Sequence, residues 1–240
     1  MNPWIQTQSG RAFDLLDPRA EDVVVADIAH ALARINRFSG HTHGEPYSVA
    51  HHSMLVADLL ASWGAPPAIV REGLLHDAGE AYYGDLTSPL KAALRDHVNP
   101  HLGKFTTSEV TGEHVATIRN VVGTFTASID RVVRAALMLP EHETPLVKRA
   151  DMVALAIERR DLFGGVEEPR DWALPEYAPT SAPCGRIGGR YASGAPAPHE
   201  RSVIAPSDLC TWDAARDRFL ALLSALDAQW PGERTAEASP

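Results

Sequence analysis

The adjacent residues His76 and Asp77 are the part of this sequence with the clearest chemical potential. An imidazole and a carboxylate are both common ligands of divalent transition metals, and here they interrupt an otherwise apolar segment. A His-Asp pair also occurs by chance in many proteins, so it indicates a metal site only when further ligands accompany it. Two candidates do so: His52 upstream and Asp151 downstream, each in a stretch with helical periodicity.

Helical spacing favours His52 over its neighbour His51, because residues three and four apart share one face of a helix. His52 falls on the same face as the apolar Val56 and Leu59, whereas His51 falls on the side of Asp58. The pattern therefore predicts that His52 points inward as a ligand and that His51 lies on the polar side.

Asp151 is surrounded by apolar residues at helical spacing, and a carboxylate buried there is costly unless it is paired or bound to a metal. Taken alone, a salt bridge from a surface position to Lys148 or Arg149 explains it equally well. Together with the two histidines and Asp77, the metal interpretation is favoured. Two imidazoles and two carboxylates suit Mn, Co, Fe, Ni or Zn and leave coordination positions for water and substrate.

The spacing of apolar residues predicts an all-α domain in which separate helices carry these ligands. Before the first helix, residues 1–16 can form at most a short hairpin. Ser48 is expected to cap the helix of His52, and Thr144 with Pro145 to open the helix of Asp151. The expected helices cover about residues 22–35, 49–63, 66–84, 89–98, 107–123, 128–138 and 145–163, with the His-Asp pair inside the continuous helix 66–84.

The 240 residues, 45% of them hydrophobic, can bury one sizeable core, so a single domain is the first expectation. We expect the core over residues 1–163, followed by a Pro- and Gly-rich loop or lid over 164–207 whose composition leans toward disorder. A final helix over 208–230 would pack back on the core, and residues 231–240 would form a mobile tail.

The net charge of −9 and the isoelectric point near 5.6 argue against duplex nucleic acid or a membrane surface as a partner. No apolar run approaches the ~20 residues needed to span a bilayer, and the N-terminus lacks the apolar core of a signal peptide. Two cysteines are too few for a disulfide framework. These features predict a soluble, cytoplasmic protein.

Four short segments follow one another in order: Ser48–Ser53, His76–Ala81, Gly84–Lys91 and Leu146–Asp151. Together they resemble the HD-domain superfamily of metal-dependent phosphohydrolases, and locally its bacterial 5′-deoxynucleotidase branch. Residues 4–7 and 27–32 also resemble bacterial and phage proteins described only as phosphohydrolases. The matches cover residues 1–160.

The resemblance implies an HD-domain helical bundle that holds one divalent ion. Its ligands would be His52, His76, Asp77 and Asp151. Glu80 and Asp85 would stand beside the ion, where one takes the proton of the attacking water and the other orients that water or protonates the leaving oxygen. Which of the two performs which step stays open.

The resemblance also implies that Arg37 binds the substrate phosphate, for which its planar guanidinium is suited. Phe38 stands where the family has a tryptophan near the sugar, so sugar selectivity stays open, and Lys91 could approach a phosphate. The expected reaction removes the 5′-phosphate of deoxynucleoside monophosphates. Alternatives are a deoxynucleoside triphosphate phosphohydrolase, a nucleotide-binding regulatory module without turnover, and a purely structural metal. A homodimer is expected from the resemblance alone.

Overall fold

The structure, a computed structural model, describes residues 3–102, 121–163 and 211–229. In these ranges the chain is mostly helical, and its strands form one two-stranded hairpin, which confirms the all-α prediction. The elements are β1 (Trp4–Gln6), β2 (Ala12–Asp14), the short 3₁₀ helices η1 (Ala20–Asp22) and η2 (Arg37–Gly40), and the helices α1 (Val25–Arg34), α2 (Val49–Ser62), α3 (Pro67–Leu75), α4 (Glu80–Tyr83), α5 (Ser88–Leu102), α7 (Val121–Ala136), α8 (Pro145–Leu162) and α9 (Trp212–Gln229). The predictions for residues 164–207 and 231–240 and for most of the helix 107–123 lie outside the described residues.

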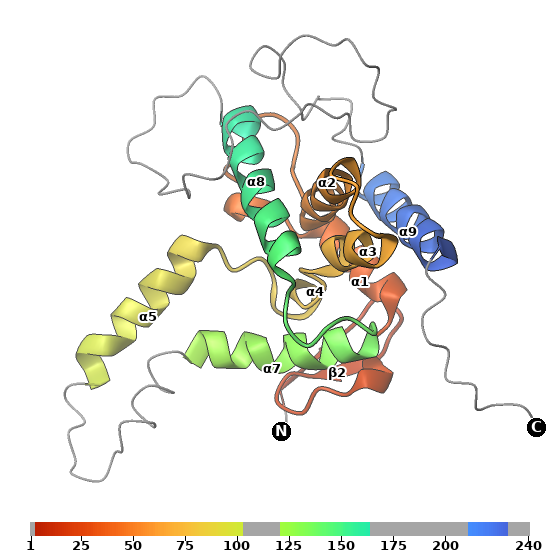
Figure 1. Cartoon of the computed structure of the whole chain (residues 1–240). Helices are drawn as coiled ribbons and strands as arrows, with labels where there is room; N and C mark the ends of the chain where they lie inside the picture. Colours follow the sequence, from red (N-terminus) through yellow and green to blue (C-terminus); the bar gives the residue numbers. More distant parts are fainter. Residues whose placement is uncertain (1–2, 103–120, 164–210, 230–240) are drawn as a thin grey trace, which may run out of the picture.

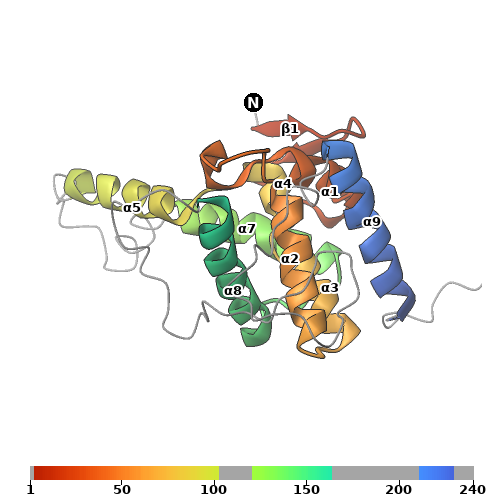
Figure 2. The same cartoon turned by 90° about the horizontal axis from the view of Figure 1, so that it is seen from above.

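Helix α2 lies at the centre of the bundle, in contact with α1, α3, α8 and α9 (Figures 1 and 2). It begins as predicted, because Ser48 accepts a hydrogen bond from the backbone N–H of His51. The predicted polar side of this helix is wrong, since His51 is only 2% exposed. Neighbouring helices enclose the first turns of α2, and only its later residues such as Asp58 and Ser62 reach solvent. The ring of His51 takes part in the cap, because the Ser48 backbone N–H donates to its Nδ1 at 3.2 Å.

The continuous helix predicted over residues 66–84 is also wrong. Helix α3 ends at Leu75, and α4 begins only at Glu80. Between them the backbone N–H groups bind the carbonyl three residues back, as in the pair Glu80–Asp77 at 3.0 Å. This tighter winding is typical of a 3₁₀ turn, in which residues three apart lie almost in line. His76 and Asp77 therefore project from a turn, with Glu80 on the side of Asp77.

Helix α8 starts at Pro145 as predicted, although the side chain of Thr144 makes no capping hydrogen bond. Its start is fixed from α3 instead, where Glu72 accepts the Thr144 backbone N–H at 2.9 Å and the Arg134 side chain at 2.8 Å. The helix that carries Asp151 is thus tied directly to the helix that leads to His76.

Helix α9 packs on α1 and α3 and buries Ala215, Phe219, Leu223 and Leu226. The β1–β2 hairpin pairs Trp4 with Asp14 and Gln6 with Ala12. Helix α5 contacts α7 and projects away from the other elements (Figure 2). Within the described ranges, none of the helices is long and apolar enough to cross a membrane.

Candidate metal centre

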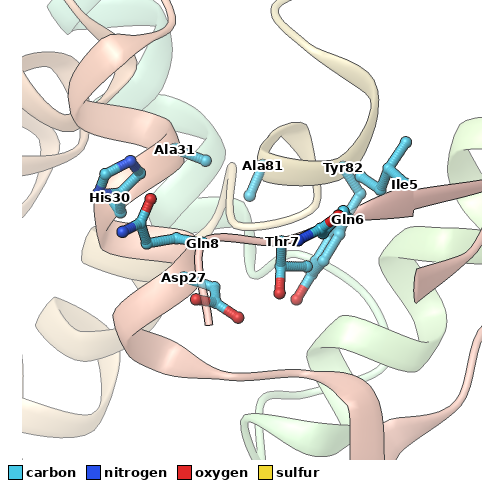
Figure 3. A pocket seen from close by; sticks show the side chains of 9 residues that line it. All are labelled: Ile5, Gln6, Thr7, Gln8, Asp27, His30, Ala31, Ala81 and Tyr82. Atoms are coloured by element: carbon cyan, nitrogen blue, oxygen red, sulfur yellow. The ribbon is translucent and has the colours of Figure 1, made fainter. Parts of the chain in front are cut away.

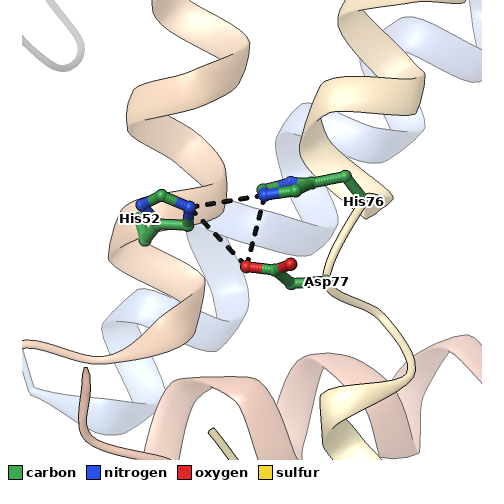
Figure 4. Close-up of side chains that lie close together, drawn as sticks. All are labelled: His52, His76 and Asp77. Atoms are coloured by element: carbon green, nitrogen blue, oxygen red, sulfur yellow. Dashed lines mark hydrogen bonds and ion pairs between the residues drawn. The ribbon is translucent and has the colours of Figure 1, made fainter. Parts of the chain in front are cut away.

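The side chains of His52, His76 and Asp77 converge between α2 and the turn after α3 (Figure 4). The two Nε2 atoms lie 3.3 Å apart, and Asp77 Oδ2 lies 3.6 Å from His52 Nε2 and 3.2 Å from His76 Nε2. Ligands at about 2.0–2.2 Å from one ion in neighbouring coordination positions are separated by roughly 3 Å. These three residues could therefore hold a metal ion with little movement.

The other ring nitrogen of each histidine is held by the protein. His52 Nδ1 lies 2.6 Å from Glu158 Oε1, and His76 Nδ1 lies 2.8 Å from the carbonyl oxygen of Gly73. Because both partners accept hydrogen bonds, each Nδ1 carries a proton, which leaves Nε2 as the nitrogen that can bind a metal ion once it is deprotonated. Metal-binding histidines commonly have such partners, which orient the ring and fix its tautomer. The donor set thus fits a divalent transition metal.

Asp151 lies beside the His52, His76 and Asp77 group and contacts both a candidate ligand and a lysine. Its Oδ1 lies 3.3 Å from His52 Nε2, on the ligand side, while its Oδ2 accepts a hydrogen bond from Lys148 Nζ at 2.7 Å. The carboxylate is therefore held at the edge of the cluster by a lysine, with one oxygen facing the same histidine nitrogen as Asp77.

Glu80 and Asp85 lie beside Asp77, close enough that its charge raises the pKa of each. Glu80 is 6% exposed, and its Oε2 has no hydrogen-bond partner among the described residues. Burial, followed by the charges of Asp77 and Asp85, raises the pKa of Glu80 to about 9. Burial is also the first cause of the raised pKa of Asp85.

Arg37 reaches the cluster from the loop after α1. Its Nη1 lies 3.7 Å from Asp77 Oδ2 and its Nη2 lies 3.2 Å from Glu158 Oε2, whereas its buried Nε has no partner among the described residues. The next residue, Phe38, has a φ of 55°, in the left-handed region that non-glycine residues rarely adopt. Its ring centroid lies 5.3 Å from the guanidinium carbon. Lys91 is exposed on α5, and its charge lowers the pKa values of Glu80 and Asp85.

No family model matches the sequence. It is 33% identical to the uncharacterized protein YfdR of Escherichia coli K12 over 178 residues, which cover 74% of this chain and 82% of YfdR. The chain belongs to the YfdR family. It is also 47% identical over 96 residues, 38% of its length, to the uncharacterized protein RCAP_rcc00048 of Rhodobacter capsulatus, of which the match covers about half, 48%. Neither name states an activity, so the function of this YfdR-family chain must be argued from its site.

Opposite charges hold the centre together. Burial alone would lower the pKa of His76, but Asp77 and Asp151 outweigh it and raise that pKa to about 10. Burial would likewise raise the carboxyl pKa values of Asp77 and Asp151, but the two histidines hold both well below their ordinary range. Protons on the imidazoles of His52 and His76 thus balance the negative charges of Asp77 and Asp151.

Glu158 was not among the predicted site residues, yet it contacts both His52 and Arg37. A signal was present in the sequence, because Glu158 follows Asp151 by seven residues and Ala154 by four, which places all three on one face of α8. A second carboxylate on the buried face of this helix, Glu158 after Asp151, indicates a site residue for the same reason as the first.

A separate open cavity of about 430 Å³ lies between the hairpin, α1 and α4, lined in part by Gln6, Asp27, His30 and Tyr82 (Figure 3). None of the candidate metal ligands lines it. The carboxylate of Asp27 is already engaged, because the backbone N–H and the hydroxyl of Ser9 donate to it at 2.8 and 2.7 Å. Asp27 therefore anchors the hairpin turn to α1.

Proposed function

We propose that the protein is an HD-domain phosphohydrolase that uses one divalent cation to remove the 5′-phosphate of deoxynucleoside monophosphates. The observation that carries this proposal is the position of Arg37 beside the His-His-Asp cluster, with its buried Nε–H lacking an acceptor among the described residues. A buried donor without a partner costs about 1–3 kcal/mol. An oxygen of a phosphate bound at the cation would satisfy it.

The cation, with Asp151 as its fourth protein ligand, would supply Lewis-acid chemistry that polarises phosphorus and lowers the pKa of a nearby water. Arg37 would donate from Nε to a phosphate oxygen while Asp77 and Glu158 hold its terminal nitrogens. Glu80 would accept the water proton through its unpartnered Oε2. Asp85 would orient the water or protonate the leaving oxygen; exchange of these two roles is equally compatible with their raised pKa values.

A monophosphate is favoured over a triphosphate because, among the described residues, two cationic side chains that could meet additional phosphate charge are already paired away from the cluster of His52, His76 and Asp77 or at its edge. Arg34 pairs with an aspartate of α9 at 3.2 Å, and Lys148 pairs with Asp151 at 2.7 Å. Arg37 and Lys91, the two residues predicted to bind the phosphate, remain as cationic groups for it. The deoxynucleoside triphosphate reaction is therefore the second candidate. A cytoplasmic location, expected from the composition, and a homodimer, expected from the resemblance, belong to the same proposal.

The test is phosphate release from ribo- and deoxynucleoside mono-, di- and triphosphates with added Mn²⁺ or Co²⁺. Release from deoxynucleoside monophosphates alone would support the proposal, and release from triphosphates would support the second candidate. Nucleotide binding without release would replace both with a regulatory module. Unfolding of the protein by chelators, with no release under any condition, would indicate a structural metal.

Two variants separate cation binding from turnover. Asp77→Ala is expected to lose both the cation-dependent rise in melting temperature and phosphate release, whereas Glu80→Gln is expected to keep the rise and lose release. Glu141→Gln is the control, because Glu141 is an exposed carboxylate. Full activity of Glu80→Gln would show that Glu80 is not the proton acceptor.

A further inference from the structure

The carboxylate of Glu158 is shared between a metal ligand and the phosphate-binding arginine. One oxygen, Oε1, lies 2.6 Å from His52 Nδ1, and the other, Oε2, lies 3.2 Å from Arg37 Nη2. The side chain of Glu158 is 0% exposed, so water cannot substitute for either partner. The hydroxyl of buried Tyr47 also interacts with this carboxylate, so Glu158 is enclosed by His52, Arg37 and Tyr47.

Glu158 remains charged in this setting. Burial would raise its pKa, but Arg37 and His52 outweigh burial and lower it. A buried carboxylate that stays ionised is a strong hydrogen-bond acceptor, and hydrogen bonds to charged groups are shorter and stronger than neutral ones.

The backbone N–H of Arg37 donates to the Tyr47 carbonyl at 2.9 Å, but its long side chain needs partners of its own. Arg37 opens the short helix η2, in which the next two residues, Phe38 and Ser39, have φ values of 55° and 54° rather than helical ones. The guanidinium is held instead by carboxylates that come from two other elements, Asp77 from the turn after α3 and Glu158 from α8.

We propose that Glu158 is a positioning residue that serves both halves of the site: it presents His52 Nε2 to the cation and holds Arg37 ready for the phosphate. The second half of this statement rests on the proposed function, whereas the first concerns cation binding alone. The position of His52 as a cation ligand and the position of Arg37 as a phosphate donor then both depend on this one side chain of α8. The alternative is that Glu158 only neutralises the charge of buried Arg37.

Cobalt binding distinguishes a positioning role of Glu158 from simple neutralisation of Arg37. The variant Glu158→Gln is compared with the control variant Glu72→Gln. Both residues are buried glutamates paired with an arginine, but Glu72 contacts none of the candidate ligands in the hydrogen bonds and ion pairs of the described residues. In the chelator-treated full-length protein, Glu158→Gln is expected to lower Co²⁺ affinity about 10- to 100-fold and to change the Co²⁺ absorption spectrum. Glu72→Gln is expected to change neither. Wild-type affinity and spectrum in Glu158→Gln would overturn the role at His52.

The wild-type protein provides a test that does not depend on whether a variant folds. In its Zn²⁺-loaded form, ¹H–¹⁵N spectra of the histidine rings are expected to show His52 protonated at Nδ1, with that proton shifted far downfield by the carboxylate. A His52 ring protonated at Nε2 instead would overturn the proposal. Glu158→Asp, which keeps the charge but shortens the side chain, is expected to shift this proton and to bind Co²⁺ less tightly than wild type.

Inorganic phosphate tests the arginine half. At saturating Co²⁺, Glu158→Gln is expected to bind phosphate roughly 2- to 12-fold more weakly, the effect of leaving one long side chain to be immobilised on binding. Equal phosphate affinity in wild type and Glu158→Gln would restrict Glu158 to His52 and refute the shared role. Absence of phosphate binding to wild-type protein would count against the proposed function and against the arginine half, while the cobalt and zinc results would still decide the role at His52.

Discussion

A buried ion pair between α3 and α7 is expected to contribute strongly to stability, although it lies outside the metal centre. Arg134 Nη2 donates to Glu72 Oε1 at 2.8 Å, and Arg134 Nε donates to the Pro140 carbonyl at 2.6 Å. The same Glu72 oxygen accepts the Thr144 backbone N–H. The pair therefore fixes the connection from α7 to α8, and with it the start of the helix that carries Asp151.

Removal of one partner leaves the other charge buried. Arg134→Met would strand Glu72, which is 1% exposed, and is expected to lower the free energy of unfolding by about 3–5 kcal/mol. Glu72→Gln keeps an acceptor for Thr144 and leaves Arg134 bound to Pro140, so its cost is expected to be about 1.5–3 kcal/mol. Because the double variant strands no charge, its cost is expected to fall about 2–3 kcal/mol short of the sum.

Urea unfolding is followed by circular dichroism and by tryptophan fluorescence. It measures the free energy of unfolding of four chelator-treated proteins: the wild type, the two single variants and the double variant. Coincident transitions by the two probes would justify a two-state treatment. If the destabilisation of the double variant equals the sum for the two single variants to within about 0.5 kcal/mol, the range found for independent sites, Glu72 and Arg134 are not coupled and the reasoning is refuted.

Two further predictions concern the helix contact beneath the site and the hairpin anchor. Gly73→Ala gains about 1 kcal/mol in helix propensity, but its methyl group would collide with buried Leu60, at a cost of about 1–3 kcal/mol. We therefore expect urea unfolding to show a free energy of unfolding lowered by about 0–2 kcal/mol, and titration to show weaker Co²⁺ binding. Higher stability with unchanged Co²⁺ affinity would contradict this prediction. Burial would raise the pKa of Asp27, but hydrogen bonds led by Ser9 outweigh it and hold the pKa below 3.8. The stability advantage of wild type over Asp27→Asn should therefore be full above about pH 4 and shrink as the pH falls through the lowered pKa; an equal advantage at pH 7 and pH 3 would contradict this.

Residue types and helical faces in the sequence selected side chains that the structure brings together, but apolar periodicity misjudged the backbone that carries them. His52, His76 and Asp77 were selected by residue type and by helical faces, and the structure brings them together. The continuous helix through His76 and Asp77 failed because apolar periodicity does not reveal where hydrogen bonds change from four to three residues back. Gly79 is packed so closely on Asp130 of α7 that a Cβ atom would collide with it, a contact that depends on a distant segment.

Burial of polar side chains was the least predictable property. His51 was assigned to a polar side because Asp58 shares its face, but α2 is surrounded by other helices and His51 is enclosed. Glu158 was overlooked because its importance comes from partners more than a hundred residues away, at sequence separations of 106 and 121. Helical spacing indicates which side chains share a face, whereas the partners that justify a buried charge come from other helices.

The same charges link cation binding to the readiness of Glu80. A proton and a divalent cation compete for Nε2 of His76, because a histidine must be neutral to bind a metal. The raised pKa of Glu80, about 9, comes first from burial and then from the charges of Asp77 and Asp85. A cation bound to Asp77 would compensate part of that negative charge and so lower the pKa of Glu80 toward neutrality. Glu80 would then be ionised, and able to accept a proton, mainly when the cation is in place, so the site would assemble its base and its Lewis acid together.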